Sequence, residues 1–325
     1  MTLAMPIREA PAVAHGLAAQ DILSVSQFQR GGLTAIFELA DWMRDVVERE
    51  GGTDLLARRV LAALFYEPST RTSASFIAAM QRLGGTVIPI TQGVQFSSVA
   101  KGESLPDTIR TLEQYSDVIV LRHPEVGSAK VAADAARVPV VNAGDGAGEH
   151  PTQALLDLYT IRKHKGRVSG LTVAIVGDIT NSRVARSNIH GLRKLGARVR
   201  VCGPPTMLPP HVEELGAEAT SDVREALAGV DVVMALRIQK ERLGKASFPS
   251  LREYARFFGI NREVLESASP DAIVMHPGPI NRGVELSSDV ADGPRSVILD
   301  QVENGVAVRM AIIYLLAGGR AEWSS

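Results

Sequence analysis

The chain of 325 residues contains one cysteine, Cys202, and carries almost no net charge. A single cysteine excludes an intrachain disulfide and any zinc site built on several thiolates, and it favours a reducing cytoplasm. Lys and Arg total 35 against 36 Asp and Glu, for a net charge of −1. This balance argues against a nucleic-acid binder, which is usually basic, and against a polybasic membrane-surface protein.

Long apolar runs are also missing. No run approaches the roughly 20 residues of a membrane span. The first residues lack a basic start followed by an apolar block, so we expect no signal peptide. A hydrophobic fraction of 45% and a charged fraction of 22% are ordinary for a globular protein. The length allows about two domains.

Several catalytic motifs are absent as well. The chain has no G-x-S-x-G elbow, no Walker A sequence and no H-E-x-x-H metal spacing. The glycines of GDGAG (144–148) are spaced G-x-G-x-G, and at the end of the strand at 171–178 only Gly177 of a dinucleotide fingerprint is present. We therefore expect no metal and no cofactor, and an NAD-dependent oxidoreductase is disfavoured.

What is present is a regular alternation of apolar runs and amphipathic stretches. Strands are predicted at 59–65, 86–90, 117–122, 138–143, 171–178, 197–203, 231–237 and 272–277. Helices are predicted at 70–83, 104–115, 128–136, 150–165, 182–196, 209–216, 222–229 and 302–318. Strand–helix alternation is typical of a parallel sheet. The predicted fold class is α/β, with two domains that are each a parallel sheet flanked by helices.

Hydroxyl and basic side chains follow the first predicted strand, in FYEPSTRTSASF (65–76). Ser69, Thr70 and Thr72 offer hydroxyls, Arg71 offers a guanidinium, and a helix N-terminus offers backbone N–H groups. This combination suits a phosphate. An ordinary Ser69 N-cap beside a solvated arginine explains the same residues, and the placement between strand and helix favours the anion site.

A loop of about 13 residues follows the second strand and contains SSVAKGES (97–104). Long loops in compact domains are usually functional or mobile, so Lys101 is a candidate anion ligand. A solvated surface lysine is the commoner alternative. Ser98 and Lys101 also match S-x-x-K, but the S-D-N and K-T-G companions of the β-lactamases are absent.

Further polar residues follow other strands. Arg122 ends the strand predicted at 117–122 and His123 follows it, and ligands of parallel sheets bind at strand ends. In EHPTQ (149–153), Pro151 favours the first helical position, which puts His150 at the helix start and Gln153 about one turn in. Both can donate hydrogen bonds to one ligand, while a capping His150 is the structural alternative.

The second half of the chain repeats this arrangement. Arg183 is expected in the first turn of a helix, where a cation opposes the helix dipole and a substrate carboxylate would explain it. Arg237 and Gln239 share one face if their strand continues. The turn formed by Pro277, Gly278 and Pro279 can present backbone carbonyls to a ligand. Solvated basic residues and a plain structural turn are the competing interpretations.

Together these segments resemble the catalytic chains of the aspartate transcarbamoylase family over nearly the whole sequence. The resemblance rests on these segments, in order: STRTS, KGES, LRHP, GDGAGEHPTQ, VGDITNSR, RIQKER and HPGP. HPTQ and RIQKER indicate the aspartate enzymes. The ornithine enzymes look different and have HCLP where this chain has HPGP. The family fold consists of two parallel α/β domains. It implies a carbamoyl-phosphate-binding domain at 1–149 plus 307–325 and an L-aspartate-binding domain at 150–306.

The resemblance also implies roles for individual residues. The phosphate of carbamoyl phosphate would be held by Ser69, Thr70, Arg71, Thr72, Ser97 and Lys101. The carbamoyl oxygen would accept from Thr72, Arg122 and His150, and the carbamoyl amide would bind Gln153 and the backbone of Pro277 and Gly278. L-Aspartate would be bound by Lys101, Arg183, Arg237 and Gln239. Among these, Arg71, Thr72, Arg122 and His150 are the expected catalytic residues.

The family forms a homotrimer with shared active sites, so Ser97 and Lys101 are expected to come from a neighbouring chain. Ser73 stands where the best-known enterobacterial form has arginine, and HPGPINRG (276–283) is similar to members that assemble with dihydroorotase. A dodecamer with dihydroorotase is therefore a hypothesis. A transcarbamoylase for another amine and a catalytically silent scaffold are the alternatives in function.

Overall fold

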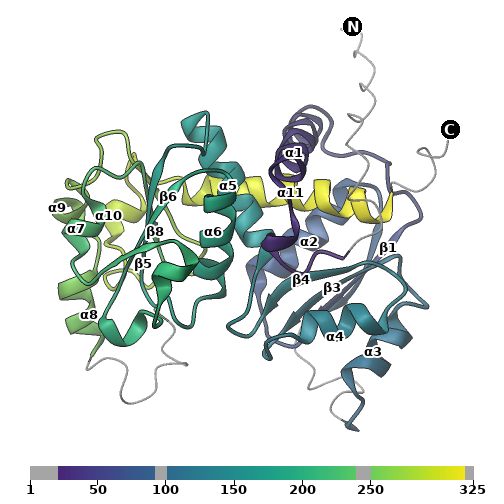
Figure 1. Ribbon diagram of the computed structural model, residues 1–325. Coiled ribbons are helices and arrows are strands. Elements are labelled where there is room, and N and C mark those ends of the chain that lie inside the picture. The colour runs from purple at the N-terminus through teal and green to yellow at the C-terminus, as the bar shows by residue number, and fades with distance from the viewer. Residues whose placement is uncertain (1–20, 92–100, 239–249, 319–325) are drawn as a thin grey trace, which may run out of the picture. The chain divides into compact units, whose positions relative to one another are not determined.

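The computed structural model describes residues 21–91, 101–238 and 250–318 (Figure 1). These residues form two compact units. Unit 1 runs to Asp145 and resumes at Glu303, and unit 2 spans Gly146–Val302.

Unit 1 is built on a parallel sheet with the strand order β2-β1-β3-β4. Its strands are β1 (Val60–Phe65), β2 (Thr86–Ile90), β3 (Val118–His123) and β4 (Val140–Asp145). Strands covered on both faces read as near-continuous apolar runs, and the runs in the sequence predicted all of these strands. In the register, Phe65 pairs with Arg122, so the ends of β1 and β3 lie side by side.

Helices cover both faces of this sheet. They are α2 (Thr70–Arg82), α3 (Leu105–Leu112) and α4 (Ser128–Ala135). Ile109 of α3 and Ala132 of α4 share an apolar cluster with Leu64 of β1. In Figure 1, α2 lies on the side of the sheet opposite to α3 and α4. The helical periodicity of the sequence predicted all three helices.

Two long helices and a short 3₁₀ turn complete unit 1. They are α1 (Arg30–Glu50), the 3₁₀ helix η1 (Val25–Gln27) and α11 (Ile298–Ala317), which belongs to unit 1 from Glu303 onward. Arg44 of α1 donates from Nη1 to Asn304 Oδ1 of α11 over 3.0 Å. The sequence predicted α11 but not α1, although α1 buries Leu33, Phe37 and Ala40 at helical spacing.

Unit 2 has a parallel sheet with the strand order β7-β6-β5-β8-β9. Its strands are β5 (Thr172–Val176), β6 (Arg198–Cys202), β7 (Glu218–Thr220), β8 (Val232–Ala235) and β9 (Ile273–Met275). The short, partly exposed edge strand β7 was not predicted. The strand predicted at 231–237 ends at Ala235, so strand alternation does not place Arg237.

The helices of unit 2 are α5 (Pro151–Lys165), α6 (Arg183–Lys194), α7 (Val223–Leu227), α8 (Leu251–Phe258), α9 (Arg262–Leu265) and α10 (Ser288–Ala291), with the 3₁₀ helices η4 (Pro205–Met207) and η5 (Val212–Leu215). Helices α7 to α10 contribute Leu227, Tyr254, Leu265 and Val290 to one apolar cluster with Val233 of β8. The helix predicted at 209–216 is wrong, because only η5 forms between prolines and Gly216. The sequence did not predict α8, α9 or α10.

The predicted fold class, two parallel sheets flanked by helices, is confirmed. All strands of a parallel sheet end at the same edge, where ligands bind in α/β proteins. In unit 1 this edge carries the residues after Phe65 and His123, and in unit 2 those after Val176, Ala235 and Met275.

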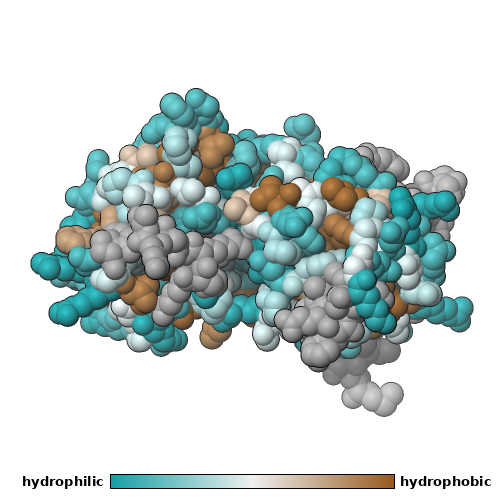
Figure 2. Space-filling view, turned by 90° about the horizontal axis from the view of Figure 1, so that it is seen from below, coloured by the Kyte–Doolittle hydropathy of each residue, from teal (hydrophilic) through white to brown (hydrophobic). Residues whose placement is uncertain are grey.

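The surface shows no large apolar area on the face drawn in Figure 2, where hydrophilic residues predominate and apolar ones form small separate areas. Large apolar side chains that are exposed are Leu55, Tyr115, Val126, Val131, Phe257, Leu299 and Val302. Among the described helices, none combines the length and the apolar character that a membrane span requires.

Candidate functional site

The N-terminus of α2 provides donors at the strand-end edge of unit 1. Ser69 occupies the N-cap with an extended backbone, but its hydroxyl makes no capping bond to the helix. The capping interpretation is therefore wrong for this side chain. Instead, Ser73 Oγ donates to Ser69 O over 2.7 Å. Thr72 is buried and Arg71 is exposed. First-turn N–H groups with the positive end of the helix dipole attract an anion.

Arg122 lies beside this helix start, at the end of β3. Its Nη1 donates to Ala143 O over 3.4 Å, and its Nε lies 3.5 Å from Glu67 Oε2. The two side chains are 15% and 25% exposed, so the ion pair is partly shielded from water. Glu67 is separated from the STRTS segment by one proline, and no motif in the sequence marks it as a site residue. Its contact with a candidate anion ligand gives it a place in the site.

His123 has a structural environment rather than a ligand-binding one. Its Nδ1 accepts the Glu125 N–H over 3.1 Å, and its ring centroid lies 4.4 Å from that of Tyr66. Burial lowers the pKa of His123, more strongly than the nearby carboxylates of Glu125, Glu67 and Asp145 raise it. Burial also raises the pKa of the Tyr66 hydroxyl. Both rings are therefore neutral near pH 7, which leaves Arg122 as the cation of this strand end.

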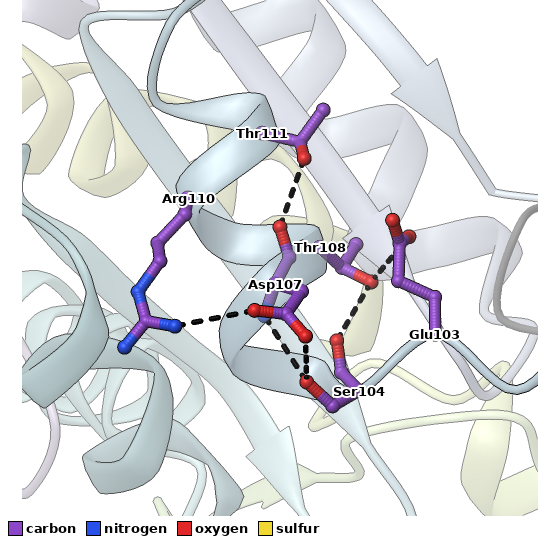
Figure 3. Close-up of polar contacts among 6 residues, drawn as sticks. All are labelled: Glu103, Ser104, Asp107, Thr108, Arg110 and Thr111. Carbon is purple, nitrogen blue, oxygen red and sulfur yellow. Dashed lines mark hydrogen bonds and ion pairs between the residues drawn. The ribbon is translucent and has the colours of Figure 1, made fainter.

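Lys101 is exposed where the described chain resumes, just before α3. Figure 3 shows how the following residues hold that segment to the helix. Ser104 caps α3 by accepting the Asp107 N–H over 3.3 Å, and Thr108 Oγ1 donates to Glu103 Oε2 over 2.9 Å. The backbone that leads out of Lys101 is thus anchored at the start of α3. Ser97, the other loop residue predicted, lies outside the described residues.

In unit 2, His150 is the N-cap of α5 and Pro151 is the first helical residue, as predicted. The His150 side chain makes no capping bond, so the capping alternative is not supported. Its backbone N–H donates to Ser187 Oγ over 3.0 Å, and Ser187 Oγ donates to Glu149 Oε2 over 3.0 Å. These bonds tie the start of α5 to α6. The imidazole is buried, with Nδ1 3.5 Å from Thr152 Oγ1.

Gln153 is buried one turn along α5, and its Nε2 donates to Asp157 Oδ1 over 2.9 Å. Arg183 is the first residue of α6, as predicted, and is 7% exposed. Ser182 caps α6 by accepting the Ala185 N–H over 3.1 Å. A cation at this helix end opposes the dipole, so helix stability does not explain its presence.

Arg237 is half-buried two residues beyond β8. The segment after β9 reaches the same strand end, because Asn281 Nδ2 donates to Ile238 O over 3.1 Å. Since Ile238 is next to Arg237, the turn at 277–279 and Arg237 belong to one edge of the sheet. Gln239 lies outside the described residues.

The segment that begins with Pro277 and Gly278 is held by its neighbour His276. Gly278 N–H donates to His276 Nδ1 over 2.8 Å, and His276 Nε2 lies 3.2 Å from Glu285 Oε1. An Nδ1 that accepts leaves the proton on Nε2, where it is donated to Glu285. Both side chains are essentially buried. The backbone of Pro277 and Gly278 is therefore rigidly presented after β9.

The predicted site residues thus form two groups, one at the strand-end edge of each unit. Unit 1 carries Ser69, Thr70, Arg71, Thr72 and Arg122. Unit 2 carries His150, Gln153, Arg183, Arg237, Pro277 and Gly278. In the part of the chain that the structure describes, no three His, Cys, Asp or Glu residues are grouped as metal ligands would be.

Two family models match most of the chain. The carbamoyl-P binding domain of the aspartate/ornithine carbamoyltransferases matches residues 20–163, and their Asp/Orn binding domain matches residues 169–316. The aspartate carbamoyltransferase catalytic subunit of Syntrophotalea carbinolica is 53% identical over 300 residues, covering 92% of this chain and 95% of the relative. That of Geobacter sulfurreducens is 52% identical, with 94% and 98% coverage.

Solved structures give the same result. Aspartate transcarbamoylase from Trypanosoma cruzi in complex with carbamoyl phosphate and aspartate has a TM-score of 0.88 at 37% identity, over 95% of this chain and 99% of that chain. The same protein in complex with N-(phosphonacetyl)-L-aspartic acid has a TM-score of 0.86 at 38% identity, with 92% and 96% coverage. The chain belongs to the aspartate/ornithine carbamoyltransferase family, among the aspartate carbamoyltransferase catalytic subunits.

Proposed function

We propose that the two groups of residues described above bind the two substrates of a carbamoyl transfer. The chain transfers the carbamoyl group of carbamoyl phosphate to the amine of L-aspartate, giving N-carbamoyl-L-aspartate and phosphate. Two arginines, Arg183 and Arg237, lie at the strand-end edge of unit 2, and this is the observation that favours aspartate as the amine substrate. A dicarboxylate offers a partner to each guanidinium, whereas ornithine would bring an ammonium group to one of them.

Unit 1 binds carbamoyl phosphate in this proposal. Its phosphate lies at the N-terminus of α2, where Ser69, Thr70, Arg71 and Thr72 supply hydroxyl, guanidinium and backbone donors. Arg122 supplies a further cation from the end of β3. Because Glu67 lies against Arg122 in the structure described here, a bound anion competes with this carboxylate for the guanidinium.

The carbamoyl group itself is polarised and oriented by a further set of donors and acceptors in this proposal. Its oxygen accepts from Thr72, Arg122 and His150, which stabilise the tetrahedral oxyanion that forms when the amine attacks. Each fixed donor of this kind lowers the barrier by roughly 3–4 kcal/mol. Gln153 and the backbone of Pro277 and Gly278 bind the carbamoyl amide. Phosphate is the leaving group and takes the amine proton.

Unit 2 binds L-aspartate. Arg183 holds the α-carboxylate and Arg237, with Gln239, the side-chain carboxylate. These charge-assisted bonds keep the amine close to the carbamoyl carbon, and proximity of this kind supplies much of the rate. We assign the carbamoyl-phosphate domain to residues 1–149 plus 307–325 and the aspartate domain to residues 150–306, bounds that lie within four residues of those of the two units.

The working enzyme is a homotrimer in this proposal, with Ser97 and Lys101 contributed to the site by a neighbouring chain. The resemblance of HPGPINRG to members that assemble with dihydroorotase supports a dodecamer with that enzyme. The product belongs to the pyrimidine pathway, and the single cysteine supports a cytoplasmic location.

The decisive experiment measures carbamoyl-phosphate-dependent turnover of the full chain with L-aspartate and, separately, with L-ornithine. We expect turnover with aspartate that exceeds turnover with ornithine by at least about a hundredfold, because each mismatched charge costs several kcal/mol in a buried site. Preference for ornithine would overturn the assignment. Absence of turnover with either amine would support a silent scaffold instead.

A further inference from the structure

A fully buried carboxylate lies at the centre of unit 2. Asp157 is on α5, one turn after Gln153, and is 0% exposed. Its Oδ1 accepts from Gln153 Nε2 over 2.9 Å and from Gln301 Nε2 over 2.8 Å. Its Oδ2 accepts from Asn188 Nδ2 over 2.8 Å. Burial of a carboxylate is unfavourable unless hydrogen bonds compensate for the lost water, and these amides do so.

This arrangement determines which way the Gln153 amide points. A side-chain amide has a donating NH₂ end and an accepting oxygen end, whereas a carboxylate only accepts. Because Nε2 of Gln153 faces Asp157, its Oε1 lies on the opposite side of the amide. Gln153 therefore presents an acceptor, rather than a donor, at the first turn of α5.

The same carboxylate orients a second amide by the same rule. Gln301 turns its Nε2 to Asp157, and its Oε1 accepts the backbone N–H of His276 over 2.8 Å. His276 is the residue from which the turn with Pro277 and Gly278 departs. Asp157 thus supports both the Gln153 acceptor and the segment whose backbone carbonyls are the other candidate acceptors.

We propose that Asp157 is a positioning residue that makes the site select an acyl phosphate with an NH₂ group on its acyl carbon over one with a methyl group. The inference rests on the proposed function, since it assumes that Gln153 binds the carbamoyl amide. An NH₂ group donates to Gln153 Oε1, whereas a methyl group leaves this oxygen without a hydrogen bond. Sites built to bind a polar group reject analogues that lack it.

The test compares carbamoyl phosphate with acetyl phosphate, which has a methyl group in place of NH₂. The dissociation constants of both, and of inorganic phosphate, are measured by calorimetry on the full-length enzyme and its variants. The quantity of interest is the ratio of the acetyl phosphate constant to the carbamoyl phosphate constant. In Asp157→Leu the two glutamine amides lose their orienting acceptor, and we expect the ratio to fall about tenfold or more. Phosphate binding should change by less than about threefold.

Asp157→Ala serves if the leucine variant does not fold. It also removes the oxygen that accepts from both glutamines, so the ratio should fall here as well. Thr160→Val is the matched control, because Thr160 is also buried on α5 and its hydroxyl donates to Leu156 O of the same helix over 2.7 Å. Its ratio should equal that of the wild type.

If Asp157 had a purely structural role, its substitution would weaken the binding of both acyl phosphates equally and leave the ratio unchanged. This result would overturn the proposal. The double variant Asp157→Leu/Gln153→Met gives a second criterion. Its ratio should match that of Gln153→Met alone, because Asp157 acts through Gln153; a further drop would contradict this. Failure of the proposed function is distinguishable, since the wild-type enzyme would then not bind carbamoyl phosphate more tightly than acetyl phosphate.

Discussion

The guanidinium carbon of Arg309 lies 5.0 Å from the centroid of the Phe76 ring, and Arg309 Nη1 donates to Ser75 Oγ over 2.8 Å. Arg309 is on α11 and is 3% exposed, while Ser75 and Phe76 are on α2. Helix α11 therefore supports the helix whose N-terminus is the candidate phosphate site. A desolvated cation over an aromatic face contributes about 2 kcal/mol.

Arg309→Met should destabilise the protein by about 2–4 kcal/mol, because it removes this cation–π contact and leaves the Ser75 hydroxyl without its donor. Urea unfolding followed by circular dichroism measures the loss. The matched control is Arg256→Met, since Arg256 lies 5.5 Å from the Phe257 ring but both residues are exposed. The control should change stability by less than about 0.5 kcal/mol. Equal effects of the two substitutions would contradict the assigned role of Arg309.

Arg183→Gln should impair the use of aspartate selectively. Loss of a charge-assisted pair with a carboxylate in a buried position costs about 3 kcal/mol, so kcat/KM for aspartate should fall about a hundredfold or more. Binding of carbamoyl phosphate, measured by calorimetry without aspartate, should stay within about threefold of the wild type. Arg186→Gln, at an exposed position on the same helix, is the control and should leave both values unchanged. An unaltered aspartate KM in Arg183→Gln would remove this residue from the site.

His123→Asn should reduce the dependence of stability on pH. Burial lowers the pKa of His123 in the folded state, whereas the unfolded chain has an ordinary histidine pKa of about 6.5. The unfolded state therefore binds the proton first, and the wild type loses stability as the pH falls below about 6.5. Asparagine can still accept the Glu125 N–H and does not titrate. The stability of the wild type relative to the variant should thus fall between pH 7.5 and pH 5.5.

The same comparison at pH 7.5 and pH 8.5 is the control, because His123 is neutral there in both states. The difference in free energy of unfolding should be constant in that range. A difference that stays constant down to pH 5.5 would show that His123 has no lowered pKa.

Cys202 should be inert in the folded protein. It is fully buried at the end of β6, and burial raises the pKa of its thiol to about 12. Because the thiolate is the reactive form, iodoacetamide at pH 8 should label the native chain far more slowly than the urea-unfolded chain. Mass spectrometry of the intact protein counts the added groups. Rapid labelling of the native protein would mean that β6 opens readily.

Shared sites can be tested by mixing two inactive chains. Lys101→Ala removes the residue that a neighbour contributes, and Arg71→Ala removes a residue of the site's own chain. In randomly mixed trimers about a quarter of the sites should combine an intact Arg71 with an intact Lys101, so about a quarter of the activity should return. A chain that carries both substitutions, mixed with each single variant, should restore nothing. Lack of recovery in the first mixture would place Lys101 in its own chain's site.

Much of the fold follows from local patterns. Apolar runs between turn residues predicted β1 to β6, β8 and β9, because strands covered on both faces must be apolar. The elements that the sequence did not predict also have local explanations. The glycines at 31 and 32 weaken helix propensity at the start of α1, and its buried face decides the outcome. The helices α9 and α10 have four residues each, too few for a periodic signal to stand out, and β7 is a partly exposed edge strand of three residues.

Which chemical groups follow the strands can be predicted from the sequence alone, because a residue's type and its distance from a strand end are local properties. Arg122, His150 and Arg183 were predicted in this way, at the end of β3, the N-cap of α5 and the start of α6. Which of these groups contact one another depends on the folded chain. Gln301 lies 144 positions from Asp157, and no local pattern links them. Chain folding brings the two together, and the orientation of the Gln153 amide depends on that long-range contact.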